Sequence, residues 1–345
     1  MKTLKPILFL LALALGHTSW AQVVSVSNTQ PLRGEKVQIT YDPVPEAAFS
    51  LTDPVFVYYR VMEESGQDYK DVLRLQRAEG KLVGELTMPD QASVIRLSFV
   101  SNGDWDREQS QLLQIVDADG NFYRNGYGES VYSDNEAYQK ELDAYPDNYA
   151  IYRARWQILA ASQPEEGPET IRKEWRKIER KGTRNAEYYH AKVSAHASLG
   201  EFETAIEGLG EMMDQFPASP WIGDAFSFLR YQLFSKQAGP QPELDERVKE
   251  FTRMHPGSEM AKDQIGSFVL GAEIEDTELV ASIAQAWIEK DPTLPMMHLA
   301  AARVAESREE KLAHLNQASN LFLNREIAMR EGLTWNYLVY YMLPV

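Results

Sequence analysis

The sequence predicts a multidomain β + α protein in which a strand-rich region precedes an all-helical region. Up to about residue 123, apolar and polar residues alternate over short runs that Gly and Pro separate, which is typical of β-strands joined by turns. From about residue 135 onward, apolar residues recur at steps of three and four, which is typical of amphipathic helices. The predicted organisation is a leader over 1–21, a β region over 22–123, a linker over 124–134 and a helical region over 135–345.

The first 21 residues have the features of a secretory signal peptide. Lys2 and Lys5 precede an apolar run over 6–16, and Ser19 and Ala21 place small residues where a signal peptidase cleaves. The run is too short to span a bilayer stably, and no cysteine follows it to which a lipid could be attached. We therefore expect cleavage after Ala21, no membrane insertion of the mature chain, and a periplasmic or secreted protein. A retained membrane anchor is the alternative.

Composition excludes several classes of chemistry. The 345 residues include 35 basic and 51 acidic side chains, a net charge of −16 that becomes −18 once Lys2 and Lys5 leave with the leader. Nucleic-acid and anionic-membrane surfaces require clustered basic residues, so we expect no nucleic-acid partner. The chain has no cysteine, which excludes disulfides, cysteine nucleophiles and thiolate metal sites. The hydrophobic share of 44% is enough for a sizeable core.

Strand patterns in the β region predict a β-sandwich of the immunoglobulin type. The runs expected to form strands include GEKVQITYDP (34–43), PVFVYYRVM (54–62), LVGELTMP (82–89), VIRLSF (94–99) and LLQIVDADGNFY (112–123). Turn residues such as Gly80 and Gly120 separate them at short, regular intervals. Around seven short strands within about 100 residues are typical of such a sandwich, and we expect the last run to form a closing hairpin.

The clearest helical element is the stretch from 190 to 220, which predicts two short helices joined at Gly200. Gly200 can adopt a positive φ and end the first helix, and Pro217 cannot continue the second. The positions of Gly200, Ala205 and Pro217 match the pattern of a tetratricopeptide (TPR) repeat. The alternative is an ordinary αα-hairpin within an all-helical domain.

Prolines end several of the predicted helices at regular intervals. They stand at Pro146, Pro217, Pro256 and Pro292, with gaps of 71, 39 and 36 residues. One helical pair in roughly 34–40 residues gives this spacing, with the first gap holding two pairs. The regular spacing of these helix-ending prolines favours a TPR-like array of stacked hairpins over an unrelated helix bundle.

The strand over 34–43 and the stretch VIRLSFVSNGDWD over 94–106 also carry a family resemblance. Together with the order of the parts, they resemble the N-terminal portion of exported bacterial thioredoxin-family proteins of the TlpA/ResA-like type. The resemblance implies an immunoglobulin-like sandwich and a TPR-like helical region, which in that family a thioredoxin domain with a Cys-x-x-Cys motif follows. Because this chain has no cysteine, the family's redox residues have no position here and none is carried over.

No motif predicts a catalytic, cofactor or metal centre. Asp117, Asp119 and Asn121 imitate the start of a calcium loop, but the twelfth-position ligand is missing. Asp-Gly is also the usual turn dipeptide, so we expect a hairpin turn there. His190 and His196 are six residues apart, which places them on different faces of a helix. Neither His-Glu-x-x-His nor Gly-x-Ser-x-Gly occurs.

Aromatic residues supply the candidate binding surface. Trp105 stands in an acidic turn, and Tyr127, Tyr132 and Tyr138 stand at or beside the predicted linker. Aromatic rings with a polar tip favour recognition surfaces, so these four are the predicted partner-binding residues. The second interpretation of the tyrosines is that they pack the β region against the first helices.

These observations predict a non-catalytic exported binding or scaffold protein that recognises a protein or peptide partner on the concave face of its helical array. We expect it to be no enzyme and to need no cofactor. The first alternative is the accessory, non-redox portion of a thiol–disulfide oxidoreductase that has lost its thioredoxin domain, which the DNA downstream of the last codon would reveal. The second is a hydrolase whose two acids are far apart in the sequence.

Overall fold

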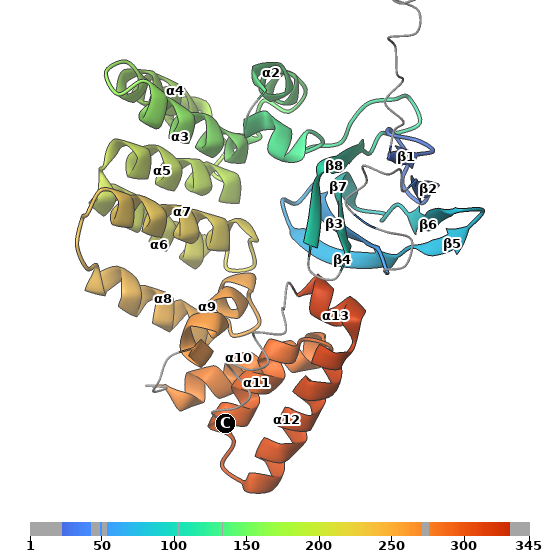
Figure 1. Cartoon of the computed structure of the whole chain (residues 1–345). Coiled ribbons are helices and arrows are strands. Elements are labelled where there is room, and N and C mark those ends of the chain that lie inside the picture. Colours follow the sequence, from blue (N-terminus) through green and yellow to red (C-terminus); the bar gives the residue numbers. More distant parts are fainter. Residues whose placement is uncertain are drawn as a thin grey trace, which may run out of the picture.

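The chain has a mixed β + α fold in which antiparallel sheets come first and helices follow, as the sequence predicts (Figure 1). The computed structural model describes residues 23–42, 49, 54–101, 104–132, 134–270 and 276–331, without the side chains of Arg107, Glu129, Tyr132 and 266–270. The predicted leader over 1–21 lies outside the described residues. Within them, no helix combines the length and apolarity that crossing a bilayer requires.

The β region contains two four-stranded antiparallel sheets that share one core. The first sheet is ordered β1-β2-β6-β5 and the second β4-β3-β7-β8. Their strands are β1 (Val24–Val26), β2 (Lys36–Tyr41), β3 (Phe56–Glu63), β4 (Asp68–Arg74), β5 (Gln76–Ala78), β6 (Lys81–Thr87), β7 (Ala92–Ser101) and β8 (Asp104–Gln114). Ile39 and Leu82 of the first sheet lie in the same buried cluster as Val61, Ile95 and Leu113 of the second. Alternate side chains of both sheets therefore form the core between them.

The end of the β region differs from the expected pattern. β8 begins at Asp104 and runs through a polar stretch that we expected to start as a loop. It lies at the edge of its sheet, where outward-facing polar side chains are tolerated. The closing hairpin expected over 112–123 is reduced, beyond β8, to a single bridge between Val116 and Phe122. Asp117 Oδ1 closes the turn by accepting from the N–H groups of Asp119 and Asn121, each at 2.9 Å.

The helical region begins directly after this turn. Its elements are η1 (Gly128–Tyr132), α2 (Asn135–Ala144), η2 (Tyr149–Ile151), α3 (Tyr152–Ser162), α4 (Gly167–Lys181), α5 (Ala186–Leu199), α6 (Phe202–Gln215), α7 (Trp221–Ser235), α8 (Pro242–Met254), α9 (Glu259–Leu270), α10 (Thr277–Lys290), α11 (Pro295–Val304), α12 (Arg308–Leu323) and α13 (Arg325–Arg330). α5 and α6 are the two helices predicted within 190–220, and they pack against each other. Gly200 ends α5 with a φ of 79°, the left-handed conformation expected of a helix-ending glycine.

Figure 1 shows the helices as an arc that starts beside the β region at η1 and α2 and returns to it at α13, which contacts β4. The β region therefore faces the inner side of the arc and connects its two ends. The buried side chains of the arc form separate clusters. One extends from Tyr149 to Met260, and a second extends from Ala261 to Ala300. The boundary between these two clusters falls at α9, opposite the β3–β4 hairpin, where a cavity lined by charged residues lies.

Candidate functional site

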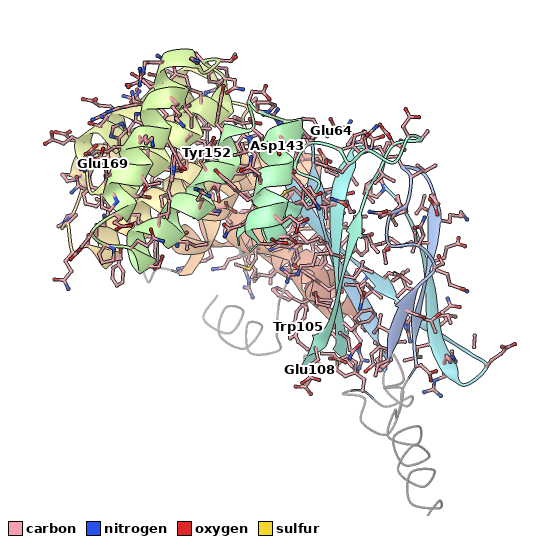
Figure 2. All side chains as sticks on the ribbon, turned by 90° about the horizontal axis from the view of Figure 1, so that it is seen from above. Glu64, Trp105, Glu108, Asp143, Tyr152 and Glu169 are labelled. Atoms are coloured by element: carbon pink, nitrogen blue, oxygen red, sulfur yellow. The ribbon has the colours of Figure 1, made fainter. Side chains whose placement is uncertain are left out.

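The four aromatic residues predicted to bind a partner do not form one surface. Trp105 lies at the start of β8, with 42% of its surface exposed and its ring edge-on to Tyr58 at 5.2 Å between centroids. Figure 2 shows Trp105 at one end of the β strands and Asp143 of α2 and Tyr152 of α3 at the other. The exposed tryptophan is thus remote from the first helices.

The tyrosines lie where the β region meets the first helices. Tyr127 is half-buried, and its ring lies 4.7 Å from that of Phe122. Tyr138 is only 4% exposed and packs edge-on against Tyr152, 5.9 Å between centroids. The side chain of Tyr132 is not described. Tyr138 therefore packs α2 against α3, and its ring offers almost no area to a partner.

A set of polar residues, most of them buried, ties the β region to these helices, and we call it the joint: Arg124, Asn125, Glu141, Asp147, Asn148 and Glu187. Arg124 Nη1 lies 2.7 Å from Asp147 Oδ1, and its Nε donates to Glu187 Oε1 at 3.2 Å. Glu187 is 8% exposed. Burial raises the pKa of Glu187, and the Arg124 charge opposes this rise without cancelling it. A chain segment that reads as a linker is therefore fixed to α5.

Asn125 is the centre of the joint. Its backbone N–H donates to Glu141 Oε1 at 2.7 Å, and its Oδ1 accepts from Asn148 Nδ2 at 2.9 Å. Its Nδ2 donates to the carbonyl oxygens of Glu63 and Glu64, at 3.4 and 3.2 Å, in the tip of the β3–β4 hairpin. Asn125 thus connects α2 to the hairpin, and its φ of 63° places it in the left-handed region that Asn tolerates better than most residues.

A cavity of about 360 Å³ lies between the β3–β4 hairpin and the helices α3, α7 and α9. Its charged and aromatic lining residues are Arg60, Asp68, Arg153, Trp221, Asp224, Glu259 and Asp263. A second cavity of about 410 Å³ shares Gln67, Pro220 and Glu259 with the first. We call the two cavities together the hairpin groove. Pro217 and His255 also line the second cavity, so the groove gathers two of the helix-ending segments that the sequence marks with prolines.

Trp221 lies at the centre of the groove and contacts the hairpin tip. Ser219 Oγ accepts from the Trp221 N–H at 3.2 Å, just before the first turn of α7. The indole packs on Gly66, where a Cβ atom would overlap the ring atoms Cζ2 and Cε2. Gly66 has a φ of +82°, so it is required both for the turn and for this close approach. On its other side, Trp221 lies 5.2 Å from the His190 ring.

Beneath Trp221, a His–Asp–Arg cluster anchors the wall of the groove. His190 is fully buried, and its Nε2–H donates to Asp224 Oδ2 at 2.6 Å. Arg153 Nε lies 3.0 Å from the same oxygen. Burial by itself would raise the pKa of Asp224, but the His190 bond and the Arg153 charge outweigh it and lower the pKa below its usual range. Asp224 is therefore held as a carboxylate at the surface of the groove.

Two acids on α9 form the opposite wall. Glu259 and Asp263 are one helical turn apart, and Lys262 Nζ lies 3.9 Å from Glu259 Oε2. Burial raises the pKa of both carboxyl groups. On the hairpin side, Arg60 pairs with Asp68. The groove therefore presents guanidinium groups, carboxylates and an indole around one space, a mixture suited to holding a polar chain with charges of both signs.

The His190–Asp224 pair resembles part of a general-base system, but its orientation favours a structural role. In a catalytic His–Asp pair, the second ring nitrogen faces the reacting group. His190 instead has a buried Nδ1 without a hydrogen-bond partner, and Asp224 rather than the imidazole reaches the cavity. Across the residues that the structure describes, no three His, Asp or Glu side chains converge as metal ligands. The arrangement supports binding more directly than proton transfer.

Comparison with known proteins places the chain in no group: no family model matches it, and neither a curated protein nor a solved structure matches it.

Sequence reasoning missed most residues of the groove. Gly66 reads as an ordinary turn glycine, and Trp221 reads as the apolar start of a helix, 155 positions later. Nothing local in the sequence pairs them. The prolines were the one signal that pointed here, because Pro217 and Pro220 lie in the groove wall.

Proposed function

We propose that the β region is an immunoglobulin-like sandwich and that the helical region is a TPR-like array. The strand orders β1-β2-β6-β5 and β4-β3-β7-β8 support the first assignment. When the eight strands are lettered A, B, C, C′, D, E, F and G in chain order, these sheets become ABED and C′CFG, the order typical of immunoglobulin-like sandwiches. Helices of 14, 14, 15 and 13 residues from α5 to α8 support a series of similar hairpins.

We propose that the protein is a non-catalytic exported binding protein that holds a peptide segment of a partner protein in the hairpin groove. The observation that carries this function is the union of two adjoining cavities, about 360 and 410 Å³, lined by charges of both signs and by Trp221. Two adjoining cavities of this volume suit a peptide segment of a few residues. Polar groups along its walls can pair with backbone and side chains, and the indole supplies apolar contact area.

The groove replaces the open concave face as the proposed binding surface. The β region lies on the inner side of the helical arc, and its hairpin contacts α7 through Gly66 and Trp221 (Figure 1). A partner that entered from this side would meet the hairpin before it met most of the helical surface. The recognition surface is therefore built from both regions, as is common for sites at domain interfaces.

The test is selection of ligands from a random-peptide phage library on the immobilised chain over residues 22–345. Enriched peptides would then be titrated against the chain and against two variants by isothermal calorimetry. Trp221→Ala removes the aromatic wall, and the double substitution Glu259→Gln with Asp263→Asn removes the acids of α9. We expect each variant to weaken binding at least about tenfold. Trp105→Ala, which removes an exposed tryptophan outside the groove, is the control and should bind like the parent.

Failure to enrich any peptide, or equal affinity of the parent and both groove variants, would contradict the proposed function. Weaker binding by Trp105→Ala alone would move the site to the β7–β8 turn.

Export is the second part of the proposal. It rests on the basic start, apolar run and small residues of 1–21. Expression of the full chain in a bacterium that has a periplasm, followed by N-terminal sequencing of the periplasmic fraction, should give Gln22 as the first residue. Recovery of an uncleaved chain in the membrane fraction would support the retained-anchor alternative instead.

A further inference from the structure

The joint contains two buried oxygen atoms that lack a donor. Glu141 and Asn148 are both fully buried, and neither Glu141 Oε2 nor Asn148 Oδ1 has a hydrogen-bond partner. The two side chains are in contact, because Asn148 Nδ2 donates to Glu141 Oε1 at 3.0 Å. A buried oxygen without a donor is costly, and two in one network require an explanation.

A proton on Glu141 Oε2 turns one of these two acceptors into a donor. A neutral Glu141 keeps Oε1 as the acceptor for Asn125 N–H and Asn148 Nδ2, and its Oε2–H becomes the donor that this part of the network lacks. An ionised Glu141 has four lone-pair sites, and its hydrogen bonds from Asn125 N–H and Asn148 Nδ2 both end at Oε1. A protonated Glu141 therefore fits the observed hydrogen bonds better than an ionised Glu141 does.

The charges around Glu141 come from both regions. Arg124, at the end of the β region, favours the ionised carboxylate, as do the N–H groups of Asn125 and Tyr127. Tyr145, after α2, is the other titrating group that interacts with it. Burial opposes these groups and outweighs them, so the pKa of Glu141 lies above its usual range.

The network continues from Glu141 to the groove. The backbone N–H of Asn125 donates to Glu141 Oε1, and the Nδ2 of Asn125 donates to the carbonyl oxygens of Glu63 and Glu64. Gly66 follows two residues later and packs on Trp221. Asn125 thus connects Glu141 directly to residues 63–68, which we call the hairpin lip of the groove. A shift of Asn125 would therefore move this lip.

We propose that Glu141 is a pH-sensitive strut: its protonated form ties the hairpin lip of the groove in place through Asn125. The inference rests on the proposed function only in naming the lip as part of a binding site, and its tests need no ligand.

The sign of the effect follows from linkage. Because the folded pKa of Glu141 is raised, its contribution to stability is fully present below the unfolded value of about 4.3 and is lost as pH rises through the folded pKa. Glu141→Gln keeps an acceptor at Oε1 and supplies a permanent N–H donor in place of Oε2, so it copies the protonated form at every pH. Glu136→Gln is the matched control, because Glu136 is on the same helix, 75% exposed and paired with Lys140.

Three measurements test the strut. Difference infrared spectra at pH 5 should contain a protonated carboxyl band that Glu141→Gln lacks and Glu136→Gln retains. Urea unfolding from pH 4 to 8 should give a stability that falls with rising pH for the parent relative to Glu141→Gln, and the Glu136→Gln profile should parallel the parent. Amide exchange at residues 63–68, corrected for its intrinsic pH dependence, should accelerate several-fold between pH 5 and 8 in the parent and stay constant in Glu141→Gln.

An infrared titration that places Glu141 at or below about 4.3 would overturn the proposal. So would parallel stability profiles of the parent and Glu141→Gln, or pH-independent exchange at the hairpin lip in the parent. Peptide binding in the groove could still hold in each of these cases. Conversely, a strut confirmed by exchange, in a chain that enriches no peptide, would leave this inference standing and remove the proposed function.

Discussion

The joint and the hairpin groove belong to the same interface between the β region and the helices, yet they use polar side chains in opposite ways. In the joint, Asn125, Glu141 and Asn148 are almost completely buried and hold one another. In the groove, Asp224 and Glu259 face a cavity and are 36% and 40% exposed. Buried polar groups that bind each other fix a geometry, whereas those that face a cavity remain available to a ligand.

The pKa directions express the same contrast. Burial raises the pKa of Glu141 in the joint, because nearby donors do not fully replace its lost hydration. In the groove, the bonds of His190 and Arg153 lower the pKa of Asp224 despite burial. Ionisation of Glu141 therefore weakens the joint, whereas ionisation of Asp224 strengthens the α7 wall of the groove. The acids of the α9 wall, Glu259 and Asp263, have raised pKa values like Glu141. Four substitutions test this comparison, from the largest expected effect to the smallest.

Arg124→Met should cost the most stability, because it leaves Glu187 buried without its cationic partner. Removing one member of a largely buried ion pair typically costs about 3 kcal/mol or more; Arg124 is 17% and Glu187 11% exposed at the side chain. Urea unfolding at pH 7 measures the loss. The control is Lys36→Met, whose pair with Glu85 is 65% and 58% exposed and should contribute less than about 0.5 kcal/mol. Equal losses in the two variants would mean that the joint is no stronger than a surface contact.

Asp224→Asn should lower stability by about 1.5 kcal/mol at pH 7, since it removes the charge that His190 and Arg153 hold while solvent screens part of the effect. Because the folded pKa of Asp224 is lowered, its carboxylate stabilises the fold above the unfolded value of about 3.9. This stabilisation is lost as pH falls through the folded pKa. The difference between variant and parent should therefore shrink below about pH 4.

The matched control for Asp224→Asn is Asp263→Asn in the opposite wall. Burial raises the pKa of Asp263, so its neutralisation should leave the stability at pH 7 unchanged or slightly increased. A loss at Asp263 as large as that at Asp224 would show that the two walls of the groove do not differ in the way proposed.

Gly66→Ala tests the contact that divides the groove from the joint. The new methyl group would overlap the Trp221 ring, and the φ of +82° adds backbone strain. Gly80→Ala carries the same strain at a φ of +81°, with no atom within 4 Å of the added Cβ. The difference between the two variants isolates the overlap and should be about 1 kcal/mol or more in urea unfolding. In a Trp221→Ala background this difference should disappear; its persistence would place the clash elsewhere.

The fold follows from local patterns more closely than the site does. Gly200 ends a helix because the next residues restart the apolar period, and both facts lie within one stretch of sequence. The two sheets follow from alternation at positions such as Val37, Ile39 and Tyr41, all of them buried. The start of β8 was not predicted as a strand, because an edge strand needs few apolar residues and its polar sequence resembles that of a loop.

The site depends on contacts between distant segments, which no local pattern encodes. In the sequence Asn125 is an ordinary linker residue, and only the structure shows its hydrogen bonds to Glu141 and to the hairpin tip. The sequence places His190 on a different helix face from His196, and its bond to Asp224 joins two helices that the sequence alone does not orient. The sequence shows that several tyrosines stand near the predicted linker. It does not show whether Tyr138 is buried or faces a partner, because that depends on the placement of α3 beside α2.

Trp105→Ala should have the smallest effect and decides between the surface seen in the sequence and the groove seen in the structure. Trp105 is 42% exposed and touches Tyr58 edge-on at 5.2 Å, so its removal should cost only about 0.5 kcal/mol. Because Trp105 lies outside both the joint and the lining of the groove, peptides selected on the parent chain should bind the variant with unchanged affinity. Trp221→Ala should lose that binding. The reverse outcome, with Trp105 required and Trp221 dispensable, would assign recognition to the β7–β8 turn and leave the hairpin groove as a packing defect between two regions.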